Sequence, residues 1–202
     1  MAWFVRGIRG CNGQPGNYVL FVAILCLCYG TNMTVYVVRH SAPNFETGTL
    51  GYYAHLNVPQ PGSPDELSEM GMHNAASLAT KLMGKGLFVD GSDVLAAVSE
   101  HSLTRQTALH AGFHYDEQVE HALLNEVELP DMTHDELAEV LRRDELPNLV
   151  LERAQQLIED PPEQGVWFTH GLVVAGLTKV LDVRHQRLLV PNYGEIRALP
   201  LN

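Results

Sequence analysis

Apolar residues in this sequence gather in short, continuous runs, separated by stretches in which apolar positions recur every three or four residues. Runs of β-branched and aromatic residues bounded by polar or glycine-rich segments are typical of strands buried on both faces of a sheet. We therefore expect strands over 34–38, 93–98 and 166–169, a weaker strand over 118–124, and a last one over 194–199 to which an antiparallel position at the sheet edge is open.

Helices are indicated between these runs. The segment Ser-Pro-Asp-Glu at 63–66 supplies an N-cap, a proline at the first helical position and a capping-box glutamate, and it predicts a helix over 66–83. A second capping box at 133–136 opens a helix toward Arg143. Further helices are expected over 102–111, 147–159 and 171–181. The alternation predicts a three-layer α/β/α sandwich with a mostly parallel central sheet.

Residues 1–32 differ from the rest of the chain. They contain Arg6 and Arg9 but no acidic residue, and their apolar run over 18–27 is shorter than the roughly 20 apolar residues that span a membrane. The leader is interpreted as an over-extended start before Met33, or as a signal or anchor segment, or as a folded extension. The functional domain is expected over 33–202. A cytoplasmic location is expected unless the leader is a genuine signal, in which case the domain is exported or anchored.

Composition narrows the function classes. The formal net charge is −11, which argues against a nucleic-acid-binding surface and against a polybasic membrane patch on the domain. All three cysteines lie within the first 30 residues, so a disulfide framework or zinc-thiolate site in the domain is excluded. The chain has no glycine-rich nucleotide-binding motif.

Polar residues follow three of the expected strands. The first strand ends in Arg39 and His40, the second leads through Ser99 to Arg105, and the fourth ends in His170 just before a helix. Ligands of open α/β sheets bind beyond the carboxyl ends of the strands, so these side chains are expected to converge. Imidazoles, guanidiniums and helix N-termini around one point favour an anion, and phosphate fits best.

Four segments in order along the chain resemble the histidine phosphatase superfamily, which has the phosphoglycerate-mutase-like fold. They are VVRH at 37–40, LSEMG at 67–71, SLTRQTA at 102–108 and FTHG at 168–171. An arginine–histidine pair alone is weak evidence, but the ordered set of four is fairly specific and spans most of the domain.

The resemblance implies roles for individual residues. His40 would be the nucleophile that becomes phosphorylated, and Glu126, on the loop after the third strand, would be the proton donor. Arg39, Arg105 and His170 would bind the phosphoryl oxygens, with Asn44 added to the phosphate-binding set. No metal or cofactor is implied, and the partner would be a small-molecule phosphoester. His101, beside the arginine segment, is expected at the pocket rim.

Several features keep alternatives open. Ser41 stands where the family usually has glycine, and the arginine segment is shorter than usual, so Arg105 could instead pair with a surface carboxylate. Glu128 and Asp131 compete with Glu126 as the acid. The activity predicted is phosphomonoester hydrolysis, with a phosphoglycerate-type mutase or a non-catalytic phosphate-binding module as alternatives. Substrate specificity is expected to reside in 44–60 and 129–143.

Overall fold

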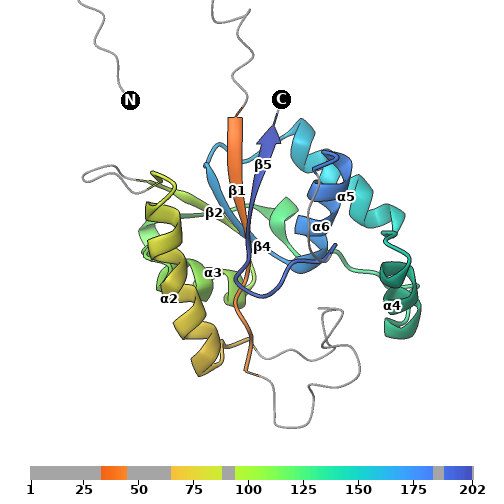
Figure 1. Cartoon of the computed structure of the whole chain (residues 1–202), viewed down its shortest axis with the longest axis horizontal. Helices are drawn as coiled ribbons and strands as arrows, with labels where there is room; N and C mark the ends of the chain where they lie inside the picture. The colour runs from red at the N-terminus through yellow and green to blue at the C-terminus, as the bar shows by residue number, and fades with distance from the viewer. Residues whose placement is uncertain (1–32, 45–64, 88–93, 184–188, 202) are drawn as a thin grey trace, which may run out of the picture. The chain divides into compact units, whose positions relative to one another are not determined.

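A computed structural model describes residues 33–44, 65–87, 94–183 and 189–201, and Met33–Leu201 form one compact unit (Figure 1). The expectations for residues 1–32 and nearly all of the loop over 44–60 lie outside the described residues. Within the described part of the chain, no helix is both long and apolar enough to cross a membrane.

A five-stranded sheet with the strand order β3-β2-β4-β1-β5 forms the centre of this unit (Figure 1). Its strands are β1 (Met33–Arg39), β2 (Ala96–Val98), β3 (Gln118–Glu120), β4 (Val166–Thr169) and β5 (Ile196–Leu201). The four strands β3, β2, β4 and β1 run parallel, and β5 pairs antiparallel with β1 at the edge. This is the mostly parallel sheet that the sequence predicts, with the edge strand in the antiparallel position.

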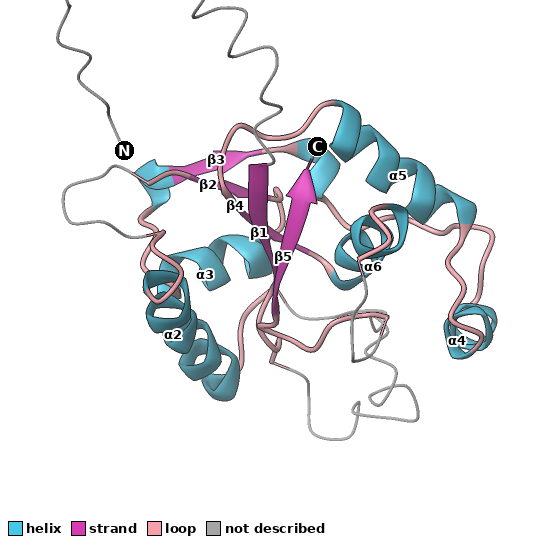
Figure 2. Cartoon of the chain, turned by 45° about the horizontal axis from the view of Figure 1, so that its top comes forward, coloured by secondary structure: helices cyan, strands magenta, loops and turns pink. Residues whose placement is uncertain are grey.

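Helices cover both faces of the sheet (Figure 2). The helices α2 (Glu69–Met83) and α3 (Ser102–His110) lie on one side, and α5 (Asn148–Glu159) and α6 (Gly171–Val180) lie on the other. Successive residues of a strand point to opposite faces, so Phe168 of β4 packs with Leu78 and Ala108 while Trp167 packs with Ala154 and Leu177. The predicted three-layer sandwich is confirmed.

The capping box over 133–136 is confirmed at the start of α4 (His134–Arg142). The Thr133 hydroxyl accepts from the Glu136 backbone N–H, and the Glu136 carboxylate accepts from the Thr133 backbone N–H at 2.8 Å. The expectation for α2 was wrong at its start, because the helix is capped by Ser68 rather than by the segment at 63–66. Leu67 lies before the helix, where it is buried and forms a β-bridge with Pro43.

Two strands are shorter than predicted. Of the expected strand over 93–98, residues 94–98 are described and the strand covers Ala96–Val98, and the expected strand over 118–124 ends at Glu120. The residues after Glu120 turn into a short 3-10 helix at Ala122–Leu124 that buries Leu124. Parallel alignment of β1, β2 and β4 brings Arg39, Ser99 and His170 to the same edge of the sheet.

Candidate active site

His40 follows β1 and is held as a neutral imidazole with one defined proton. Its backbone N–H donates to the Thr169 carbonyl at 2.9 Å, and its Nδ1 lies 2.9 Å from the Ser41 carbonyl oxygen. A carbonyl oxygen only accepts, so the proton of the neutral ring lies on Nδ1 and the lone pair on Nε2. Burial, followed by the charges of His170 and Arg39, holds the pKa of His40 well below 6.5. A neutral ring with a free lone pair is a nucleophile near pH 7.

His170 follows β4 and precedes α6, with its ring centre 5.1 Å from that of His40. Its Nε2 lies 3.0 Å from the Ser99 hydroxyl, which lies 2.7 Å from Thr104 Oγ1. Thr104 donates its own proton to the main-chain carbonyls of Ser99 and His101. Ser99 therefore donates to Thr104 and accepts from His170. The neutral His170 ring carries its proton on Nε2, which leaves Nδ1 as the unprotonated nitrogen.

Glu126 faces that second nitrogen. Its Oε2 lies 3.6 Å from Nδ1 of His170, and 27% of its side chain is exposed. Burial raises the pKa of Glu126 to about 7, although the charge of Arg39 opposes the shift. Burial, and then the charge of His101, lowers the pKa of His170 to about 3. A carboxyl group that titrates near pH 7 can both donate and accept a proton under physiological conditions.

Arg39 supplies a permanent positive charge to the cluster. Its guanidinium is almost fully buried, donates from Nη1 to the Pro191 carbonyl at 2.7 Å and lies 3.8 Å from the centre of the Tyr193 ring. The buried Nε has no hydrogen-bond partner among the described residues. Gly171 makes room for it, because a Cβ there would lie 3.1 Å from both Cζ and Nε. A buried, unpartnered guanidinium N–H fits an anion as its missing acceptor.

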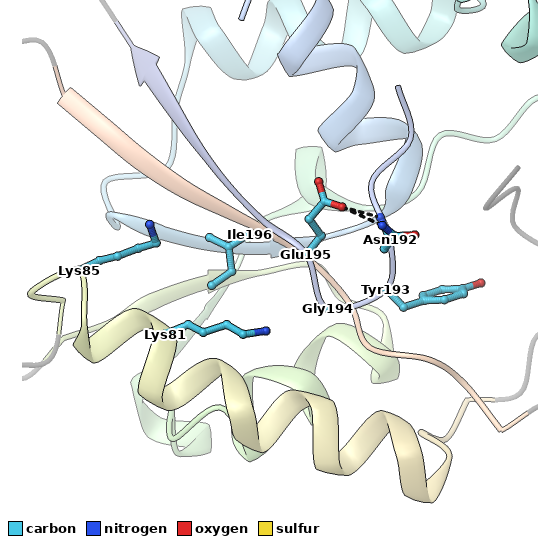
Figure 3. Close-up of a pocket in the computed structure, with 7 residues that line it drawn as sticks. All are labelled: Lys81, Lys85, Asn192, Tyr193, Gly194, Glu195 and Ile196. Carbon is cyan, nitrogen blue, oxygen red and sulfur yellow. Dashed lines mark hydrogen bonds between the residues drawn. The ribbon is translucent and has the colours of Figure 1, made fainter. Parts of the chain in front are cut away.

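The segment 192–196 lies against the end of β1 and the residue that follows it. The backbone N–H of Gly194 lies 3.2 Å from the carbonyl oxygens of both Arg39 and His40. Figure 3 shows Tyr193 on the far side of Gly194 from Lys81. Sequence reasoning missed Tyr193. Its only signal is an aromatic residue in the glycine-containing turn that leads into the last strand.

Arg105, which the sequence predicts to bind phosphate, has its described side-chain contacts outside this cluster. Its Nη1 forms an ion pair with Glu120 at 2.8 Å, and the guanidinium also lies over Tyr115. Leu103 and Thr104 are the buried positions of this turn of α3. Successive helical residues are rotated by about 100°, so Arg105 is directed toward β3, where Glu120 lies. The structure thus contains the ion pair with a surface carboxylate that the sequence analysis gave as the alternative for Arg105.

The remaining expected residues divide. Asn44 is exposed, and the described contacts give it only a backbone N–H that donates to the Glu66 carbonyl. Glu128 and Asp131 are exposed, whereas Glu126 faces His170. Ser41, which the sequence analysis noted in place of the glycine of the resembled family, is fully buried. Its backbone N–H donates to the Thr107 hydroxyl.

His101 lies where the sequence expects it, at the edge of the cluster. It caps α3, with Nδ1 accepting from the Leu103 backbone N–H at 3.2 Å, and its ring centre lies 5.4 Å from that of His170. Its Nε2 lies 3.7 Å from Asp65. Among the described residues no group of histidines, cysteines or carboxylates has the arrangement of a metal site.

Solved structures resemble this chain over most of its length. The protein TTHB049 of Thermus thermophilus is 20% identical, with a TM-score of 0.54 over 84% of this chain and 99% of that one. A phosphoglycerate mutase of the same organism is 21% identical, with a TM-score of 0.52 over the same shares of the two chains. Rv3214 of Mycobacterium tuberculosis is 21% identical, with a TM-score of 0.52 over 82% of this chain and 89% of that one.

A mycobacterial glucosyl-3-phosphoglycerate phosphatase, Rv2419c, solved in complex with VO3, is 17% identical, with a TM-score of 0.50 over 81% of this chain and 89% of that one. No family model matches the sequence, and no curated protein matches it. The structural likenesses confirm the resemblance at the level of the fold, which is phosphoglycerate-mutase-like.

Proposed function

We propose that this chain, with its phosphoglycerate-mutase-like fold, is a metal-independent phosphomonoester hydrolase that acts through phospho-His40 on a small phosphorylated metabolite. The observation that carries the proposal is the state of His40. Its Nδ1–H donates to the Ser41 carbonyl oxygen, and its Nε2 carries the free lone pair in a cluster with His170, Arg39 and Glu126.

The first half of the reaction transfers the phosphoryl group to the protein. Nε2 of His40 attacks phosphorus as the bond to the leaving alcohol oxygen breaks, and Glu126 gives its proton to that oxygen. Arg39 donates to the phosphoryl oxygens through its unpartnered Nε, which offsets the charge that spreads over them. Nδ1 remains bonded to Ser41, so the phosphorylated ring is cationic and is stabilised by that carbonyl.

The second half returns the protein to its starting state. The Glu126 carboxylate takes a proton from water, the resulting oxygen attacks phosphorus, and the bond to Nε2 breaks. His40 leaves as the neutral imidazole and phosphate is released. Glu126 ends protonated, as it began, so the cycle balances.

The fold alone does not separate a hydrolase from a mutase, since one structural neighbour is named a phosphoglycerate mutase and another a phosphatase. The position of Arg105 favours a second candidate from another class, a non-catalytic module that holds a phosphorylated ligand.

The test is a panel of sugar, glycerate and aryl phosphates, with wild type compared with His40→Ala and with the control His73→Ala on exposed α2 surface. We expect phosphate release from wild type and the control, and a loss of about a thousandfold or more in His40→Ala, equivalent to about 4 kcal/mol of barrier. Isomer interconversion without phosphate release would identify a mutase. Phosphate binding with equal, background turnover in wild type and His40→Ala would identify the binding module.

A further inference from the structure

Fewer permanently charged arginine side chains surround His40 than the sequence predicts. Arg39 is close enough to lower the pKa of both His40 and His170. Arg105 is paired with Glu120 instead, and the Arg153 guanidinium donates to the main-chain carbonyls of Leu123 and Asn125, at 3.4 and 3.3 Å. The sequence predicts a second side chain that donates to the phosphoryl oxygens beside Arg39. A residue other than Arg105 or Arg153 would therefore have to take that role.

His101 lies just beyond the carboxyl end of β2, near the residues proposed to bind the phosphoryl group. It follows Ser99 by two positions, and its ring stands edge-on to that of His170, at an interplanar angle of 85°. It also acts electrostatically on the interior, since it contributes to the lowered pKa of both His170 and His40. About 40% of its side chain is exposed, so the ring joins the buried cluster to the open side.

The protonation of His101 leaves one nitrogen available as a donor. Nδ1 accepts from the Leu103 backbone N–H, so the proton of the neutral ring lies on Nε2. That nitrogen is 3.7 Å from the Asp65 carboxylate, beyond hydrogen-bond distance. Among the described contacts, Nε2 has this long ion pair with Asp65 and no hydrogen bond.

We propose that His101 binds a phosphoryl oxygen through Nε2–H and takes the ligand position that the sequence assigns to Arg105. The inference rests on the proposed phosphoryl chemistry at His40. Leu103, two residues after His101, is buried and packs with Leu67 and Ala75. This inward-facing position of α3 therefore belongs to the core.

The alternative role for His101 is helix capping alone, and two substitutions separate the roles. Asparagine is a good N-cap residue, so His101→Asn keeps an acceptor for the Leu103 N–H but is too short and uncharged to replace Nε2. Arginine cannot accept, so His101→Arg loses the cap but restores a cationic phosphate donor. Phosphate binding should follow the presence of a donor at the Nε2 position, whereas thermal stability should follow the cap.

The measurement is the affinity of the full chain for inorganic phosphate by titration calorimetry, together with competitive inhibition of aryl phosphate hydrolysis by phosphate. We expect His101→Asn to weaken phosphate binding about tenfold with an unchanged Tm. We expect His101→Arg to stay within about threefold of wild type in affinity with a lowered Tm. Arg105→Gln should stay within about twofold of wild type.

Wild-type affinity in His101→Asn, or a tenfold loss in Arg105→Gln, would overturn the assignment. The calorimetric arm does not require turnover. If wild type and His40→Ala hydrolyse nothing, the proposed hydrolase function fails while the role of His101 is still decided by binding.

Discussion

At the scale of single residues, main-chain and hydroxyl partners set the protonation of the site. The Ser41 carbonyl fixes the proton of His40 on Nδ1, and Ser99 fixes that of His170 on Nε2. The two rings are both neutral and buried, but the nitrogen without a proton is Nε2 in His40 and Nδ1 in His170. Glu126 is the member of the cluster that titrates near neutrality.

That titration predicts how hydrolysis depends on pH. In the proposed reaction Glu126 must be protonated to give its proton to the leaving alcohol, so kcat/KM for an alkyl phosphate should fall as pH rises through about 7. Glu126→Gln should lower kcat/KM by about a hundredfold or more and remove this limb, because Gln does not titrate. An aryl phosphate, whose leaving group needs little protonation, is the control and should lose much less. A pH limb near 7 that persists in Glu126→Gln would contradict the assignment.

Ser99 is predicted to position His170 without touching substrate. Ser99→Ala removes the acceptor of the Nε2 proton and the donor to Thr104, so His170 loses its fixed orientation. We expect kcat to fall about tenfold or more, with a smaller change in KM. Ser77→Ala removes a hydroxyl that donates to the Asn74 carbonyl in α2 and should leave both constants unchanged. A KM effect alone would argue for a different role of Ser99.

At the scale of secondary-structure elements, the start of α6 is shaped around Arg39. A Cβ at Gly171 would lie 2.9 Å from Val190 Cγ1 and 3.1 Å from the Arg39 guanidinium, so Gly171→Ala must displace one of them. We expect phosphate affinity to fall about tenfold and stability to fall by about 1–3 kcal/mol, as is usual for overpacking. Calorimetric titration and urea unfolding measure the two effects.

The matched control is Gly165→Ala, where nothing lies within 4 Å of the added Cβ. It should retain wild-type phosphate affinity. Equal losses in both variants would show that backbone change, rather than crowding of Arg39, weakens binding.

Elements were predictable from the sequence where local chemistry decides them. The Thr133 capping box and the apolar run of β4 depend on neighbouring residues, and both were predicted. The start of α2 depends on the bridge between Leu67 and Pro43, which local sequence does not reveal. In the site, His40, Arg39 and His170 follow from strand ends. Tyr193 and the orientation of Arg105 depend on tertiary contacts with Arg39 and Glu120.

At the scale of the whole molecule, an acidic chain of net charge −11 concentrates cationic and neutral polar groups at one edge of its sheet. Burying Glu126 there affects stability as well as chemistry. Its pKa is about 7 in the folded protein and about 4.5 when unfolded, so the unfolded state binds fewer protons between these values. Stability contributed by this group is therefore lost as pH rises from 4.5 to 7.

Replacement of Glu126 by Gln should remove this pH dependence. The stability of Glu126→Gln relative to wild type should increase by roughly 3 kcal/mol between pH 4 and pH 8, because one pKa unit corresponds to about 1.4 kcal/mol. Urea unfolding at both pH values measures the difference, and the other titrating groups cancel in the comparison. A difference independent of pH would show that Glu126 is solvated in the folded state.

The antiparallel pairing of β1 with β5 has a consequence for biosynthesis. The guanidinium of Arg39 is held by the Pro191 carbonyl 152 positions later, and Gly194 bonds to the main chain at His40. A nascent chain emerges from its first residues onward, so His40, the proposed nucleophile, leaves the ribosome long before the turn that encloses it. Until that turn is synthesised, His40 has no enclosed pocket, so a stalled or prematurely terminated translation product should lack the proposed activity.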